Sequence, residues 1–128
     1  MSIENRSEAA EKRLLERAAE LRTDIARELA KQDEEHFADL AGEITDRSEE
    51  SVADLLVDVN LAEISRDIEE LRDVEAALRR IVDGSYGTCQ TCGEDIKQDR
   101  LTAVPAASRC YACQVEYENK TQQQHARL

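Results

Sequence analysis

The chain has 128 residues, about the length of one domain, and its composition limits the kind of core it can build. Only 3% of the residues are aromatic, none is Trp, and 36% are charged, so helices that share a narrow apolar seam fit better than a large globular core. The formal net charge of -12 repels phosphate backbones and anionic lipid. Direct DNA binding is therefore not expected.

Two long segments carry apolar residues at helical spacing. The first runs from about residue 8 to 41 without Gly or Pro, and the second runs from residue 52 until Asp83 and Gly84 stop it. The apolar positions of the first segment are Leu14, Ala18, Leu21, Ile25 and Leu29. Those of the second are Val52, Leu55, Val59, Ile64, Ile68, Leu71, Val74, Leu78 and Ile81.

These apolar positions mirror each other about residue 46, as an antiparallel pair requires. The residue numbers sum to 92 in five pairs, which are Leu14 with Leu78, Ala18 with Val74, Leu21 with Leu71, Phe37 with Leu55, and Leu40 with Val52. The pattern predicts a mainly α fold in which residues 1–83 form a long antiparallel two-helix coiled-coil hairpin with its tip near 42–48. Its arms would be roughly 50 Å long. A bundle folded over the C-terminal segment is the alternative, but residues 84–128 offer few apolar side chains to cover both arms.

Four cysteines stand in the pattern C-x2-C-x17-C-x2-C, formed by Cys89, Cys92, Cys110 and Cys113. Thiolates at this spacing can surround Zn²⁺ tetrahedrally at about 2.3 Å, and a closed four-cysteine shell leaves no position for water or substrate. We therefore predict a structural zinc-finger module over residues 84–119. Gly93 can adopt the positive φ that such a turn often needs.

Two disulfides or buried free thiols are the other interpretation of the cysteines. Residues 1–13 contain no apolar signal segment, and the chain has no apolar stretch near the ~20 residues of a membrane span. We therefore expect a soluble cytoplasmic protein, in whose reducing compartment metal ligation is favoured over disulfides. A thioredoxin-like redox pair is disfavoured because no βαβ pattern surrounds either C-x-x-C.

The sequence also predicts the local structure of the segments around the cysteines. Residues 94–105 are expected to form a small loop or β-ribbon that packs three apolar side chains near the metal, namely Ile96, Leu101 and Val104. Residues 114–119 are expected to form a short C-terminal helix, and residues 120–128 a frayed tail.

The segment from residue 33 to 58 is strongly acidic. It holds one basic residue, Arg47, against ten acids, which are Asp33, Glu34, Glu35, Asp39, Glu43, Asp46, Glu49, Glu50, Asp54 and Asp58. Such a run is often a solvated helix face without further function. On a long rigid arm, however, it could reach a basic or metal-bearing site inside another macromolecule.

A longer pattern surrounds the cysteines, Leu71-x6-Leu78-x2-Ile81-x2-Gly84-x-Tyr86-Gly87-x-Cys89-x2-Cys92-Gly93-x2-Ile96-x4-Leu101-x3-Pro105-x4-Cys110-x2-Cys113. With the acidic hairpin before it, this pattern resembles the DksA/TraR family of bacterial transcription regulators. Members of that family bind RNA polymerase rather than DNA. Their hairpin enters the secondary channel, and its acidic tip approaches the catalytic magnesium. The resemblance implies a regulator of transcription initiation, and we expect a monomer.

The resemblance also assigns roles to individual residues. The family tip is similar to Asp-x-x-Asp-Arg-Ala, and the corresponding effector residues here are Glu43, Asp46, Arg47 and Ser48, with Glu and Ser replacing the first Asp and the Ala. Two arginines correspond to polymerase-docking positions, Arg66 and Arg100.

In the best-known member of that family, basic and apolar side chains near the zinc module help the polymerase hold the alarmone ppGpp. The corresponding positions here are Glu70, Asp73, Val104 and Gln114. Carboxylates would repel a guanosine polyphosphate, so we expect any action on polymerase to be largely independent of ppGpp at this place.

Two other classes of function remain for comparison. A structural adaptor would use the hairpin to pair with another coiled coil, or with itself, and the acids would only keep it soluble. A zinc hydrolase or redox enzyme would need an open metal position or an activated nucleophile, and the sequence offers neither. We therefore predict that the protein is not an enzyme.

Overall fold

The computed structural model describes residues 3–47 and 51–126, with side chains over residues 7–47 and 51–122. The elements, in chain order, are α1 (Ile3–Ala30), α2 (Glu35–Asp46), the 3₁₀ helix η1 (Ala53–Leu56), α3 (Ser65–Asp83), α4 (Gln98–Ala103) and α5 (Tyr111–Ala126). Extended pairing within the described residues is limited to one antiparallel bridge between Thr88 and Asp95. The predicted mainly α fold is confirmed.

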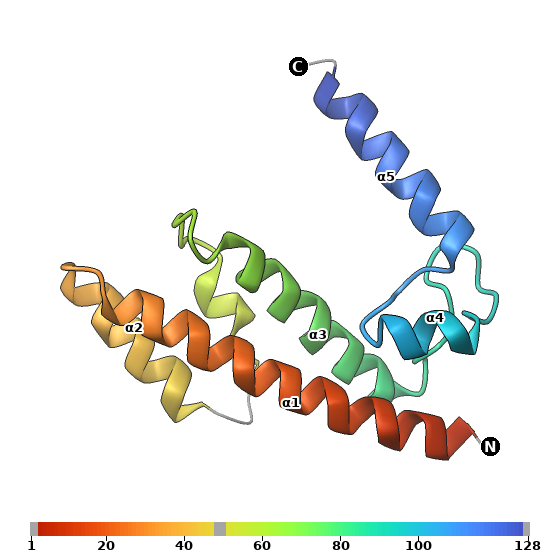
Figure 1. Cartoon of the computed structure of the whole chain (residues 1–128), viewed down its shortest axis with the longest axis horizontal. Coiled ribbons are helices and arrows are strands. Elements are labelled where there is room, and N and C mark those ends of the chain that lie inside the picture. Colours follow the sequence, from red (N-terminus) through yellow and green to blue (C-terminus); the bar gives the residue numbers. More distant parts are fainter. Residues whose placement is uncertain (1–2, 48–50, 127–128) are drawn as a thin grey trace.

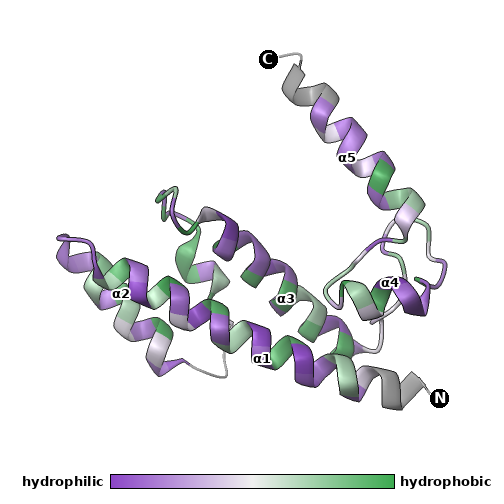
Figure 2. Cartoon of the chain, viewed as in Figure 1, coloured by the Kyte–Doolittle hydropathy of each residue, from purple (hydrophilic) through white to green (hydrophobic). Residues whose placement is uncertain are grey.

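Helices α1 and α3 form an antiparallel pair that carries the main core (Figure 1). The apolar faces of both helices turn inward, and their polar faces turn outward (Figure 2). The buried side chains include most of the predicted seam, namely Leu14, Ala18, Leu21, Ile25 and Leu29 of α1 with Ile68, Leu71 and Val74 of α3. The half of the hairpin next to the cysteines therefore follows the sequence pattern.

The first arm is shorter than predicted. Helix α1 ends at Ala30, residues 31–34 form a turn, and α2 then runs back along α1 (Figure 1). Residues 42–46 are the last turns of α2, which corrects the predicted tip at residues 42–48. Folding back buries Ala41 and Ile44 against the same core, whereas a projecting arm would leave one side of each in water.

The second arm is also interrupted. Residues 52–64, predicted to continue the second helix, instead form η1 and a series of turns, and α3 begins only at Ser65. Val52, Leu56 and Ile64 are fully buried in the core that α1 and α3 share. The observed hairpin is therefore an α1/α3 pair with α2 and η1 folded against it.

The C-terminal part differs from its prediction in two places. Residues 98–103, expected as loop or β-ribbon, form α4. Helix α5 begins at Tyr111 and continues to Ala126, so residues 120–126 are helical rather than frayed, and residues 127–128 lie outside the described part of the chain. Helix α5 extends away from the hairpin (Figure 1).

None of the helices in the described ranges is both long and apolar enough to cross a membrane.

The α1/α3 seam predicts a strong contrast between two leucines of α1. Leu21→Ala removes a fully buried side chain and is expected to lower the free energy of unfolding by about 2–5 kcal/mol, measured by denaturant titration. Leu15→Ala is the matched control, because Leu15 is 50% exposed on the same helix and its loss should change stability by less than about 0.5 kcal/mol. Equal effects of the two variants would contradict the assigned seam.

Candidate metal centre

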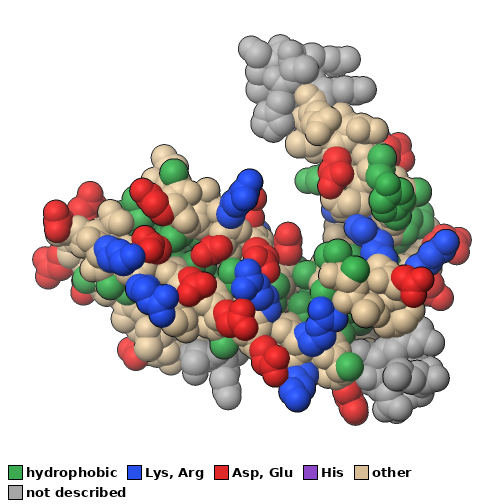
Figure 3. Space-filling view, in the orientation of Figure 1, with side chains coloured by type: hydrophobic (Ala, Val, Ile, Leu, Met, Phe, Trp, Pro, Cys, Tyr) green, Lys and Arg blue, Asp and Glu red, His purple; other side chains and the backbone are tan. Residues whose placement is uncertain are grey.

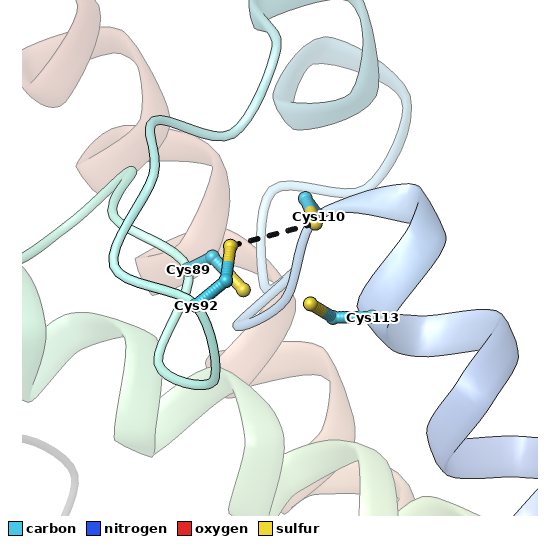
Figure 4. Close-up of side chains that lie close together, drawn as sticks. All are labelled: Cys89, Cys92, Cys110 and Cys113. Atoms are coloured by element: carbon cyan, nitrogen blue, oxygen red, sulfur yellow. Dashed lines mark hydrogen bonds between the residues drawn. The ribbon is translucent and has the colours of Figure 1, made fainter.

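The four cysteines converge on one point, although seventeen residues separate the two pairs. Cys89 and Cys92 lie on one turn, Cys110 ends the second loop, and Cys113 lies in the first turn of α5 (Figure 4). All four sulfur atoms lie within 4.8 Å of one another, and the Sγ atoms of Cys92 and Cys110 are 4.0 Å apart. Sulfur atoms at the corners of a tetrahedral zinc site are separated by about 3.8 Å. The cluster fits that shell closely.

Backbone hydrogen bonds shape the first cysteine turn. The N–H of Gly93 donates to the carbonyl of Cys89 over 2.9 Å, and the N–H of Cys89 donates to the carbonyl of Glu94 over 2.8 Å. Gly93 has a φ of 78°, the left-handed conformation expected from the sequence. This turn brings the Cys92 side chain back toward that of Cys89.

Contacts across the module hold the second cysteine pair against the first. The N–H of Gln90 donates to the carbonyl of Ser108 over 2.9 Å, and Arg109 Nε donates to Thr91 Oγ1 over 3.2 Å. Arg100 Nε donates to the carbonyl of Arg109 over 2.9 Å, so α4 supports the same loop. The two halves of the site are therefore positioned by the chain as well as by a metal.

A small core lies beside the sulfur atoms. It contains Ile96 and Leu101, as predicted, together with Ala107 and the Cys89 side chain. Val104 is 45% exposed, so the prediction that it packs near the metal is wrong. Helix α4 ends at Ala103, so Val104 follows the helix and does not share the face that buries Leu101.

The electrostatics of the cluster call for a cation. The backbone N–H of Cys92 donates a hydrogen bond to the Cys89 sulfur and lowers the pKa of that thiol to about 6. The neighbouring Cys110 sulfur raises the pKa of Cys113 to about 12. One thiolate thus forms easily, but further negative charges at this separation repel each other. A divalent cation at the centre removes that repulsion.

The donor set and its spacing fit Zn²⁺, and the predicted cofactor is confirmed. Four thiolates fill a tetrahedral shell, so the metal would hold no water or substrate and would serve a structural role. The zinc would join the Cys89 turn, the Cys110 loop and the start of α5 at one point.

The predicted polymerase-contact residues lie outside this centre. Arg66 is exposed in the first turn of α3, whereas Arg100 is half-buried in α4. Glu43, Asp46 and Arg47 are exposed at the end of α2, and Ser48 lies outside the described residues. The described effector residues therefore lie at the C-terminal end of α2, separate from the cysteine module.

The four positions at which we expected no ppGpp binding do come together. Glu70, Asp73, Val104 and Gln114 line one open cleft of about 1180 Å³ between the hairpin and α5 (Figure 3). Arg17 donates two hydrogen bonds to Glu70, of 2.6 and 2.7 Å, and these hold the pKa of Glu70 below its usual value. Burial raises the pKa of Asp73.

Arg109 is a residue of this cleft that we did not predict. Its guanidinium lies 4.0 Å from the centre of the Tyr117 ring, in addition to its bond to Thr91. The sequence signal was weak, because an Arg next to Cys110 and a Tyr on the following helix have no fixed spacing that identifies such a pair.

Zinc removal is expected to act on one part of the chain. Cys113→Ser, or a strong chelator, should abolish metal binding and unfold residues 84–119 while the α1/α3 core persists, because metal binding supplies much of the folding free energy of a small module. Metal content and residue-resolved amide exchange measure the two effects. Gln90→Ala, an exposed change within the same turn, should keep one zinc per chain. Unchanged exchange after chelation would contradict this division.

The comparisons with known proteins agree with this site. The family model described as the prokaryotic dksA/traR C4-type zinc finger matches residues 84–119. The RNA polymerase-binding transcription factor DksA of Caulobacter vibrioides is 43% identical over 47 residues, which cover 37% of this chain and 33% of that protein. The chain spans less than half the length of the curated relatives that it matches first.

Solved structures extend the similarity to nearly the whole chain. Transcription factor DksA2 from Pseudomonas aeruginosa has a TM-score of 0.58 and 27% identity, covering 94% of this chain and 88% of that one. The DnaK suppressor protein from Agrobacterium tumefaciens has a TM-score of 0.57 and 34% identity, covering 85% of this chain and 91% of that one. The predicted resemblance is confirmed, and the chain belongs to the DksA/TraR family.

Proposed function

We propose that this protein regulates transcription initiation by binding RNA polymerase, with the acidic region entering the secondary channel. The proposal is supported by family membership and by relatives that are named RNA polymerase-binding transcription factors. It assigns the cysteine module to docking and the acidic region to the effect on the polymerase.

The observation that carries the proposal is the combination of an acidic end with a zinc module fixed to the same hairpin. The acids of the region described by the structure are all exposed, namely Asp33, Glu34, Glu35, Asp39, Glu43, Asp46, Asp54 and Asp58. Figure 3 shows acidic side chains gathered at the end of the molecule away from α5. Exposed carboxylates are free to approach a basic or magnesium-bearing site.

The zinc module is anchored to the hairpin by side chains at the end of α3. Arg80 Nη2 lies 3.4 Å from the carbonyls of Ala106 and Ala107, and the Tyr86 hydroxyl donates to the carbonyl of Pro105 over 2.9 Å. A partner that binds the zinc module would therefore also set the orientation of α3 and of the elements packed on it. This linkage supports docking at one end and action at the other.

Independence from ppGpp is part of the proposal. The four corresponding positions hold two carboxylates, an aliphatic side chain and an amide, whereas the arginines that line the cleft stand at other positions, namely Arg13, Arg17, Arg72, Arg100 and Arg109. Arg17 already occupies both oxygens of Glu70, and Arg109 stacks on Tyr117. A ligand with several phosphates would have to displace these contacts.

A coiled-coil adaptor is less well supported. Such a protein would offer its apolar seam to a partner, but the seam of α1 and α3 is already buried inside this chain. Sedimentation analysis distinguishes the two proposals, because an adaptor pairing through the hairpin would form a stable dimer, whereas we propose a monomer.

Asp46, at the end of α2, provides the test of the acidic region. Asp46→Asn is expected to leave affinity for core RNA polymerase within about twofold and to abolish the effect on promoter output in a purified transcription assay, because an amide retains the shape but not the charge. Glu8→Gln is the matched control, since it removes one exposed negative charge near the N-terminus of α1, outside the acidic region. An unchanged promoter effect in Asp46→Asn would remove Asp46 from the proposed effector group.

Arg66 provides a separate test of docking. Arg66→Ala should weaken polymerase binding several-fold through the loss of a charge-assisted contact, measured by a binding titration at fixed salt. Arg79→Ala removes another exposed arginine of α3 and should bind like the unchanged protein. Equal losses in the two variants would indicate general charge attraction rather than docking at Arg66.

A further inference from the structure

Glu75 is a buried carboxylate that no role above uses. It lies on α3 with 4% of its surface exposed, and it is the one charged residue buried among the described side chains. Its Oε1 accepts hydrogen bonds from Ser51 Oγ (2.7 Å) and from the N–H of Ala53 (3.2 Å), and its Oε2 accepts one from the N–H of Val52 (2.9 Å). The described residues place no Lys, Arg or His in an ion pair with it.

These hydrogen bonds all lead to one short segment. Val52 and Ala53 begin η1, and their N–H groups would otherwise be buried without an acceptor. A carboxylate satisfies such donors better than a neutral group, because hydrogen bonds to a charged acceptor are the stronger ones. Glu75 therefore pins the start of η1 to the middle of α3.

The same contacts cannot exist in the hairpin that the apolar pattern favours. If residues 52–83 formed one helix, Val52 and Glu75 would lie about 34 Å apart along its axis. The folded-back arrangement and the extended hairpin are thus mutually exclusive. Glu75 contacts residues 51–53 in the first and must find water or another partner in the second.

The extended alternative is encoded in the sequence. The mirror pattern about residue 46 continues through Leu40 with Val52 and Phe37 with Leu55, beyond the part that α1 and α3 use. In the folded-back state Phe37, Leu40 and Leu55 are only partly buried. These side chains retain apolar surface that pairing with each other in a longer seam could cover.

Helix α2 packs on α1 partly through small side chains. A hollow of about 530 Å³ lies along the two helices, lined largely by small residues, which are Thr23, Ala26, Ala30, Ala41, Gly42 and Thr45, with Arg27 and Asp46. Small side chains gain little dispersion energy across such a gap. Beside this hollow, the buried residues that α2 contributes to the core are Ala41 and Ile44.

We propose that Glu75 is a latch that holds the acidic region folded back, and that its release allows the chain to extend into the long two-helix hairpin. Extension would carry the end of the acidic region about 24 Å beyond the present end of α1, which is the rise of the sixteen residues from the end of α1 to the end of α2. The latch concerns the shape of the chain and does not depend on which partner the acidic region meets.

The test measures shape in the full zinc-loaded chain. Spin labels on Asp54 and Arg79, both exposed, are attached through non-canonical amino acids so that the cysteines stay on the metal. The folded-back state should give a separation below about 20 Å, and one continuous helix should give about 38 Å. Glu75→Gln keeps only one accepting oxygen, so it should shift population to the longer distance and raise the helical circular dichroism signal.

Two controls keep the result decisive. Glu69→Gln changes an exposed carboxylate on the same helix and should leave the short distance unchanged. Glu75→Leu, which removes both acceptors, should extend the chain at least as far as Glu75→Gln. A short distance that persists in both Glu75 variants would overturn the latch. A broad distribution with loss of helical signal would also overturn it, because Glu75 would then only stabilise the local fold.

Discussion

The apolar seam between α1 and α3 is the constraint on which the other elements depend. With one Phe, three Tyr and no Trp, the chain has few large side chains, and its Leu, Ile and Val residues must meet along a single line to exclude water. The buried residues of α2, η1 and the start of α3 belong to the same core and do not form a second one. Their positions follow from the seam.

The zinc module is a separate small core that relies on this seam for its orientation. Its cluster around Ile96, Leu101 and Ala107 is too small to fold alone without a metal. Tyr86 contacts both clusters, and its hydroxyl bonds to Pro105, so one side chain joins the module to the hairpin. The metal therefore fixes local shape, whereas Tyr86 and Arg80 transmit that position to α3.

The acidic side chains lie in three different environments. The exposed carboxylates of residues 33–46, Asp54 and Asp58 remain in water, where they cost the fold little. Glu70 is held by Arg17 at the edge of the cleft, and Glu75 is enclosed and satisfied by backbone donors. These three environments separate acids available to a partner from acids that hold the chain together.

The sequence by itself determined the zinc ligands, the helical class and the family, because cysteine spacing and apolar periodicity are local and survive any tertiary arrangement. It also identified most of the residues of α1 and α3 that are buried in the shared seam. Only the tertiary structure decided where the arms break, since the same apolar residues can be buried either along a longer seam or by folding back. Periodicity does not reveal that Glu75 meets Val52 and Ala53, because that contact joins residues more than twenty positions apart whose types carry no shared pattern.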